Sequence, residues 1–247
     1  DSRNIYTYKF RKACENADRI IAISECTKRD IIEYFGIPAD KIEVVYQGCD
    51  PSFIHPVAAE KKREIRAKYQ LPDHYILNVG SIEERKNALS AVQALMMLPE
   101  QIHLVIVGRH TEYTDKIERF IKENKLEERV HIISNVPFDD LPVFYQLAEI
   151  FVYPSRFEGF GIPIIEALYS GIPVVAATGS CLEEAGGPDS IYVHPDDIKG
   201  MADAFKQIYS DTERKKEMIE KGQKFAKRFS EEKQAVEILN IYKKLMK

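Results

Sequence analysis

Residues 153–177 read YPSRFEGFGIPIIEALYSGIPVVAA, and together with the residues just before them they predict a strand, a glycine loop, a helix and a second strand. The apolar run Ile150–Tyr153 is short enough for a buried strand, and the flexible loop Glu158–Gly161 follows it. Pro163 suits the start of a helix, where its missing N–H is not needed. The run Val174–Ala177 predicts the second strand. A strand, loop, helix and strand in this order form the repeating unit of a parallel sheet.

The loop of this unit carries the features of a binding site. Gly159 and Gly161 let the backbone approach a ligand, and the helix start behind them offers free N–H groups and a positive dipole end, as a phosphate requires. Glu158 and Glu166 flank the loop, and ionised carboxylates accept hydrogen bonds from hydroxyl groups such as those of a sugar or ribose. Alternatively, Glu166 complements the helix dipole and Glu158 caps the loop. Spacing alone leaves both interpretations open.

The run PSRFEGFGIPIIEAL, followed by GIPVVA, resembles the signature of the retaining glycosyltransferases of the GT-B fold, the group 1 family. The resemblance implies that Glu158 contacts sugar hydroxyls of a nucleotide-sugar donor and that Glu166 contacts the ribose. It also implies that the backbone of Gly159, Phe160 and Gly161 contacts the diphosphate or the sugar.

A basic pair, Arg85 and Lys86, follows a strand predicted at 75–79, and doubly wound folds bind ligands at the carboxyl ends of their strands. Members of the family have an Arg directly after the glycine of this turn and a Lys a few residues later. Lys86 matches that Lys, but Ser81 follows Gly80 where the Arg is expected. We therefore count Gly80 and Ser81 as donor-binding positions and Arg85 as the candidate replacement, with a solvent-facing Arg85 as the alternative.

Lys86, Arg85 and Glu158 are the predicted catalytic residues. A leaving diphosphate gains negative charge, which cationic side chains can stabilise. The sequence contains no Asp-x-Asp motif, so we expect metal-independent transfer with no cofactor beyond the donor. Gly159 and Gly161 also resemble part of a dinucleotide fingerprint, but Ile164 replaces its third small residue, which argues against an NAD site.

Composition limits the class of protein. The chain has 247 residues, 30% charged and 45% hydrophobic, which is typical of a globular protein. Its net charge of −4 gives no general case for nucleic acid binding. The four cysteines show no metal-binding spacing and are expected to be reduced thiols. With no signal peptide and no apolar run near the ~20 residues of a membrane span, we expect a cytoplasmic protein. Peripheral attachment at the inner face of the membrane stays open.

Predicted strands and helices alternate along the chain. This alternation predicts an α/β fold with a doubly wound, Rossmann-like parallel sheet. The helical segments include a charged one at 57–70, expected to be polar nearly all round, and a tail that is helical to its end. Strands are predicted at 19–23, 41–46, 75–79, 102–107, 130–133, 150–153, 174–177 and 191–193.

Three parts follow from this pattern and from the resemblance. Residues 1–48 are expected to be the C-terminal remnant of an acceptor-binding domain with its hinge. Residues 49–230 are expected to be the nucleotide-sugar-binding domain, and 231–247 a helix that crosses back to the first domain. The chain begins with Asp1 and not Met, directly in a helical pattern, so we expect a fragment.

The predicted function is transfer of a sugar, with retention of its anomeric configuration, from a nucleotide-diphosphate sugar to a carbohydrate or lipid-linked acceptor. The chain alone is expected to be inactive, because the acceptor side belongs to a missing N-terminal domain. Two alternatives stay open: a sugar-nucleotide epimerase of the same fold and a non-catalytic nucleotide-sugar-binding module.

Overall fold

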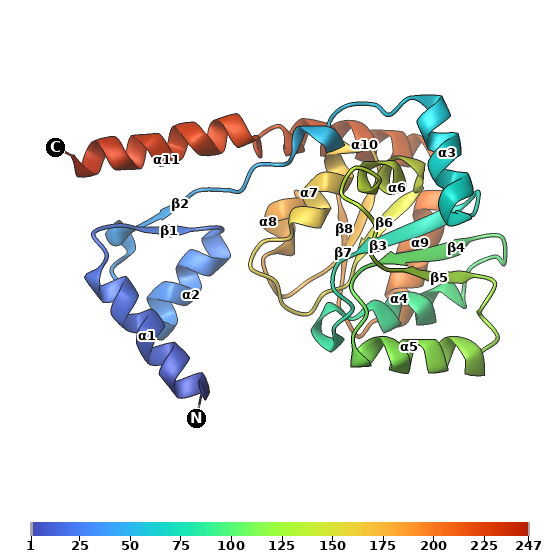
Figure 1. The fold of residues 1–247 in the computed structure, drawn as a ribbon, viewed down its shortest axis with the longest axis horizontal. Coiled ribbons are helices and arrows are strands. Elements are labelled where there is room, and N and C mark those ends of the chain that lie inside the picture. Colours follow the sequence, from blue (N-terminus) through green and yellow to red (C-terminus); the bar gives the residue numbers. More distant parts are fainter. Residues whose placement is uncertain (1, 247) are drawn as a thin grey trace. The chain divides into compact units, whose positions relative to one another are not determined.

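The computed structural model describes residues 2–246, which form two compact units, each with a parallel sheet of its own (Figure 1). The large unit comprises Cys49–Lys227. The small unit comprises the chain up to Gly48 and from Arg228 onward.

The large unit is built on a six-stranded sheet in the order β5-β4-β3-β6-β7-β8, in which every neighbouring pair is parallel. All residues of β6 and β7 are buried, because a parallel sheet covered on both faces has continuous apolar strands. The predicted α/β class with a doubly wound parallel sheet is confirmed. The strands are β3 (Tyr75–Val79), β4 (His103–Val107), β5 (Val130–Ile133), β6 (Ile150–Tyr153), β7 (Val174–Ala177) and β8 (Ile191–Val193).

Helices lie on both faces of this sheet (Figure 1). On one face, α4, α5 and α9 share a hydrophobic cluster with Ile76, Leu104 and Ile106 of the strands. On the other face, Tyr145 of α6 stacks on Phe151 of β6. Successive side chains of a strand point to opposite faces of the sheet, so the strand neighbours of Phe151 face the first side. The helices are α3 (Ala59–Tyr69), α4 (Ala88–Leu95), α5 (Glu112–Glu123), α6 (Leu141–Leu147), α7 (Ile162–Tyr169), α8 (Leu182–Gly186), α9 (Ile198–Ser210) and α10 (Thr212–Ala226). Two short 3₁₀ helices, η2 (Pro51–Phe53) and η3 (Glu84–Lys86), complete the large unit.

The charged helix predicted at 57–70 is α3, but it is not polar all round. Ile65 is 0% exposed. One fully buried side chain therefore packs α3 against the rest of the large unit, while the other residues of the helix are exposed or half-buried, as expected for a helix that is polar nearly all round. Ile65 and Tyr69 are the only large apolar side chains of α3, too few to give a clear amphipathic pattern in the sequence.

The small unit holds a two-stranded parallel sheet with three helices. Its elements are α1 (Ser2–Asn16), β1 (Ile20–Ala22), α2 (Glu25–Phe35), η1 (Ala39–Lys41), β2 (Ile42–Val44) and α11 (Glu231–Leu245). Its strands are shorter than predicted because each has one partner and the chain turns early. The Ser24 hydroxyl already caps α2, accepting the N–H of Thr27.

The start of α11 lies against the end of the small unit's N-terminal segment. The Gly48 N–H donates to Oε1 of Gln234 at 3.1 Å. A Cβ at Gly48 would lie 2.4 Å from the Glu231 backbone, so only glycine fits there. Phe229 packs edge-on against Tyr46 with ring centroids 5.2 Å apart. The last helix is therefore part of the small unit.

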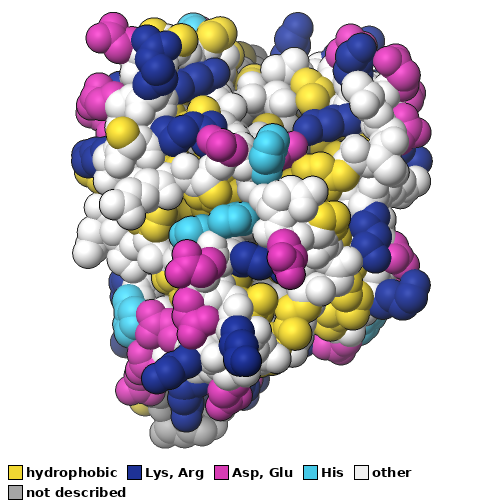
Figure 2. Space-filling model, turned by 90° about the vertical axis from the view of Figure 1, so that its right-hand side faces the viewer, with side chains coloured by type: hydrophobic (Ala, Val, Ile, Leu, Met, Phe, Trp, Pro, Cys, Tyr) yellow, Lys and Arg dark blue, Asp and Glu magenta, His cyan; other side chains and the backbone are white. Residues whose placement is uncertain are grey.

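Charges of both signs are interspersed on the surface of the face that Figure 2 shows, and two histidine side chains lie side by side near its middle. His103 of β4 and His131 of β5 stack with ring centroids 5.2 Å apart, and burial lowers the pKa of both. Mixed charge on this face does not form the basic footprint typical of nucleic-acid binding.

Within residues 2–246, none of the four cysteines forms a disulfide. None of the helices in the same range has both the length and the apolar content that crossing a membrane requires.

Candidate functional site

The order of the strands brings two loops of the large unit together. From the central strand β3 the chain adds β4 and β5 on one side, and then β6 and β7 on the other. The loops after β3 and β6 therefore leave neighbouring strand ends in opposite directions. This is a topological switch point, where open α/β sheets form a crevice for ligands. The two predicted site loops, 80–87 and 154–161, are these loops.

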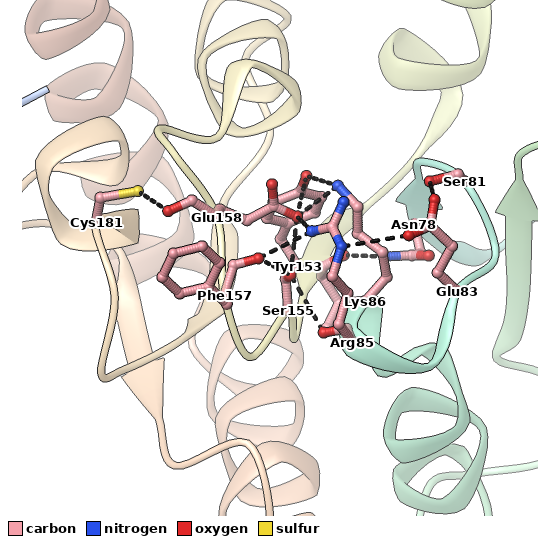
Figure 3. A network of polar contacts seen from close by, with 11 residues as sticks. Asn78, Ser81, Glu83, Arg85, Lys86, Tyr153, Ser155, Phe157, Glu158 and Cys181 are labelled. Atoms are coloured by element: carbon pink, nitrogen blue, oxygen red, sulfur yellow. Dashed lines mark hydrogen bonds and ion pairs between the residues drawn. The ribbon is translucent and has the colours of Figure 1, made fainter. Parts of the chain in front are cut away.

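Glu158 is the hub of a polar network between these loops (Figure 3). Its Oε1 lies 2.5 Å from Nζ of Lys86 and 3.5 Å from Nη1 of Arg85. The hydroxyls of Ser155 and Tyr153 donate to the same oxygen at 2.8 and 3.1 Å. The structure thus brings the three predicted catalytic side chains together.

The backbone of each loop also binds the other loop. Arg85 Nη1 donates to the carbonyl of Phe157 at 3.0 Å, and the Arg156 N–H donates to the carbonyl of Arg85 at 2.8 Å. Cys181, which precedes α8, donates its S–H to the carbonyl of Glu158 at 2.9 Å. Two segments distant in sequence therefore hold the backbone of residues 156–158 in place.

Burial differs within the basic pair. The Lys86 side chain is 15% exposed and the Glu158 side chain 12%, whereas that of Arg85 is 46% exposed. The Lys86–Glu158 ion pair is thus partly removed from water. Opposite charges interact more strongly in such a partly buried position than at the surface. Arg85 is the more exposed cation and is also 3.3 Å from Glu83 Oε2.

Gly80 and Ser81 shape the turn that leads to the basic pair. Gly80 adopts φ +152°, and its N–H donates to the carbonyl of Val107 at 2.9 Å. The Ser81 hydroxyl donates to Glu83 at 2.6 Å, and this bond lowers the pKa of the Glu83 carboxyl. Ser81 therefore orders the turn through Glu83.

The helix start behind the second loop needs glycine at one position. Gly161 caps α7 with φ +108°, a backbone conformation that side-chain-bearing residues rarely adopt. A Cβ there would lie 3.1 Å from Leu182. The Phe160 side chain is only 2% exposed. This predicted donor-binding residue can therefore contact a ligand through its backbone and not through its ring.

Glu166, in the second turn of α7, has different surroundings from Glu158. Burial raises the pKa of Glu166 to about 7, the Tyr145 hydroxyl acts against this rise, and the charge of Asp50 adds to it. The Tyr145 hydroxyl lies close enough to Glu166 to affect this pKa, but it forms no hydrogen bond with the carboxylate. Glu166 is therefore easily protonated near neutral pH, whereas the contacts of Glu158 are those of a paired carboxylate.

Three hydroxyl-bearing residues near Glu158 and Glu166, namely Tyr153, Ser155 and Tyr145, were not predicted as site residues from the sequence. Tyr153 and Ser155 were interpreted as the end of a strand and part of a turn, and Tyr145 as an apolar position of a helix. The polar groups of Tyr153 and Ser155 could have indicated a site, because polar side chains at the carboxyl end of a buried strand lie where ligands bind. No local pattern indicates that a hydroxyl on α6 faces Glu166.

Two further features lie outside this network. A pocket of about 280 Å³ is lined by residues including Glu84, Asn87 and Arg156. In the described chain, one group of metal-ligand type has its ligand atoms within 4.8 Å of one another. It consists of His110, Asp115 and Glu118, all exposed, and such exposed acidic groups are common without a metal.

Comparison with known proteins gives two family matches. Residues 61–225 match the family model described as Glycosyl transferases group 1, and residues 2–53 match the model described as Glycosyltransferase Family 4. O-antigen chain mannosyltransferase B of Escherichia coli is 30% identical over 239 residues. The match covers 95% of this chain and 62% of that protein, so the chain spans about three fifths of this curated relative.

Solved structures share the fold. A glycosyltransferase from Rickettsia africae matches with a TM-score of 0.88 and 24% identity, over 97% of this chain and 67% of that one. The Anabaena protein HepE, solved in complex with UDP and glucose, matches with a TM-score of 0.86 and 21% identity. That match covers 94% of this chain and 64% of HepE.

Proposed function

Because the chain belongs to the glycosyl transferases group 1 family, we propose that it carries the donor site of an enzyme that transfers a sugar from a nucleotide-diphosphate sugar to a glycan or lipid-linked acceptor. The observation that carries the proposal is the meeting of Lys86, Arg85 and Glu158 at the switch point of the sheet. Such a site offers cations for a diphosphate and a carboxylate for sugar hydroxyls.

Each residue has a proposed role. Lys86 and Arg85 stabilise the charge that develops on the leaving diphosphate, so the proposal assigns this task to side chains and not to a metal ion. Glu158 orients the sugar through its hydroxyls, and Glu166 binds the ribose. The loop backbone at Gly80–Ser81 and Gly159–Gly161 lines the diphosphate and the sugar. Transfer with retention is part of the proposal and rests on the family resemblance.

The acceptor side is proposed to lie outside this chain, on a missing N-terminal domain. The small unit supports this proposal because it leaves Tyr6, Leu239 and Tyr242 between 52% and 71% exposed. Contiguous exposed apolar surface marks interaction sites, and the proposal takes these side chains as part of one. We therefore expect the 247-residue chain to bind the donor but to transfer little sugar.

The names of the curated relatives suggest which ligands to test first. O-antigen mannosyltransferases are among them, so a mannose-bearing donor leads a calorimetric screen of UDP-, GDP- and ADP-linked sugars. Binding that survives a chelator supports the metal-independent part of the proposal. Binding of none of these sugars by the folded chain would refute the proposed donor site.

Two substitutions separate the roles of the cations from those of the carboxylate. Lys86→Ala is expected to weaken nucleoside diphosphate about 10- to 100-fold and nucleoside monophosphate much less, because it removes a charged hydrogen-bond donor. Glu158→Gln is expected to weaken only the sugar-bearing donor and not the nucleoside diphosphate. Equal losses for all three ligands in both variants would mean that the substitutions act through loop order, and the residue roles would fail.

A further inference from the structure

Tyr153, the last residue of β6, contacts both members of the Lys86–Glu158 pair (Figure 3). Its hydroxyl accepts a hydrogen bond from Lys86 Nζ at 3.2 Å and donates one to Glu158 Oε1 at 3.1 Å. Lys86 Nζ also lies 5.5 Å from the centroid of the tyrosine ring. One neutral side chain thus links the ammonium and the carboxylate.

The position of this hydroxyl is set by the sheet and not by the loops. The Tyr153 side chain is 2% exposed, and its ring stacks on Phe151 with centroids 6.0 Å apart. Phe151 in turn stacks on Tyr145 at 5.4 Å. Because the ring is anchored in this aromatic row, the hydroxyl is a fixed point to which the two charged groups bind.

The hydroxyl stays protonated at neutral pH and can therefore keep donating to Glu158. Burial raises the pKa of Tyr153, and the Glu158 carboxylate raises it further. A diphosphate that binds Lys86 competes with Glu158 for the charge of the ammonium. A neutral group bonded to both can hold each in place during that competition, since it carries no charge that competes with the phosphate.

We propose that Tyr153 is a positioning residue, which directs the Lys86 ammonium toward the donor diphosphate and the Glu158 carboxylate toward the donor sugar. This inference rests on the proposed function and adds a residue to which that proposal gives no role. The rest of the network agrees with it, because Ser155 bonds only the carboxylate and the loop backbone, whereas Tyr153 bonds both charges.

The test is Tyr153→Phe in the 247-residue chain, which keeps the ring and its stacking and removes only the hydroxyl. Calorimetry measures the affinities for a nucleoside diphosphate, its sugar derivative and the monophosphate. We expect about tenfold weaker binding of the first two and less than about twofold for the monophosphate, because hydrogen bonds to charged groups are lost. The matched control is Tyr75→Phe on the neighbouring strand β3. Its buried hydroxyl donates to the carbonyl of Phe144 at 2.6 Å, and its loss is expected to leave all three affinities unchanged.

A double-mutant cycle with Lys86→Ala distinguishes positioning from general support of the fold. If Tyr153 acts through Lys86, removing its hydroxyl in the Lys86→Ala background costs less than about twofold in diphosphate affinity. Fully additive losses, or a Tyr153→Phe variant that binds like Tyr75→Phe, would overturn the positioning role and leave the proposed function standing. A parent chain that binds no nucleotide would overturn both.

Discussion

In the large unit, β6 is buried over its whole length, whereas α11 of the small unit leaves Val236, Leu239 and Tyr242 more than half exposed. Apolar side chains of similar kinds are therefore buried in the large unit but largely exposed on α11 of the small unit. The six-stranded sheet of the large unit has helices on both faces and a continuous core. Beside the two-stranded sheet of the small unit lies one small hydrophobic cluster, made of the buried residues Cys14, Ala22, Ile31, Ile37 and Ile42.

The two units also differ in how firmly they can hold charged side chains. Positioned charges such as Lys86 and Glu158 need rigid elements beneath them, and the large unit supplies these through β3 and β6. The small unit leaves large apolar side chains of α1 and α11 exposed, such as Tyr6 and Tyr242. The predictions below test this contrast.

The largest expected effect is on the core of the large unit. Phe151→Ala removes a 0% exposed ring that contacts both Tyr145 and Tyr153, and should lower the free energy of unfolding by about 3–5 kcal/mol. Leu239→Ala on α11, which is 52% exposed, should change it by less than about 0.5 kcal/mol. Urea denaturation of both variants measures the difference. Similar losses would mean that the two units are equally well packed.

A second effect follows from the raised pKa of Glu166, about 7 against an ordinary value of 4.5. Between these values the folded protein holds a proton that the unfolded chain has released, so stability falls as pH rises from 4.5 to about 7. Glu166→Gln removes this loss and should make the protein more stable than the parent at pH 8, by on the order of 3 kcal/mol.

The matched comparison is the parent and Glu166→Gln denatured over a range of pH. His103 and His131 titrate in both proteins, so their contribution cancels in the difference. If the free energies of unfolding of the two proteins changed in parallel with pH, this would contradict the raised pKa of Glu166. Donor affinity of the parent should rise with pH up to about 7, because ribose binding needs the ionised carboxylate.

A smaller effect is expected at the junction of the small unit. Gly48→Ala places a Cβ against the backbone at Glu231 and should cost about 1–3 kcal/mol, confined to the small unit. Hydrogen exchange should show faster opening of α11 with the strands of the large unit unchanged. Equal acceleration in β3 and β6 would show that the two units unfold together.

The sequence predicted the large unit better than the small one. Strands at 75–79, 130–133 and 191–193 were predicted with the bounds that the structure has, because buried parallel strands are short continuous apolar runs. The strands of the small unit were predicted too long, since strand ends depend on pairing partners that the local pattern does not contain. The burial of Ile65 in α3 was missed for a similar reason.

For the candidate site, the sequence indicated which loops matter but not how their side chains pair. Arg85, Lys86 and Glu158 were all named, yet their contacts join residues more than 70 positions apart. These contacts arise because β6 lies beside β3 although two other strands separate them along the chain. The roles of the Tyr153 and Tyr145 hydroxyls depend on the same strand order and could not be predicted from local spacing.

The most direct measurement compares donor binding by the large unit alone, residues 49–227, with binding by the whole chain. If the donor site belongs to the large unit, calorimetry with the best-binding nucleotide sugar should give affinities within about twofold of each other. A folded large unit that binds the donor more than about tenfold more weakly than the whole chain would contradict this assignment, because the small unit would then contribute to the donor site.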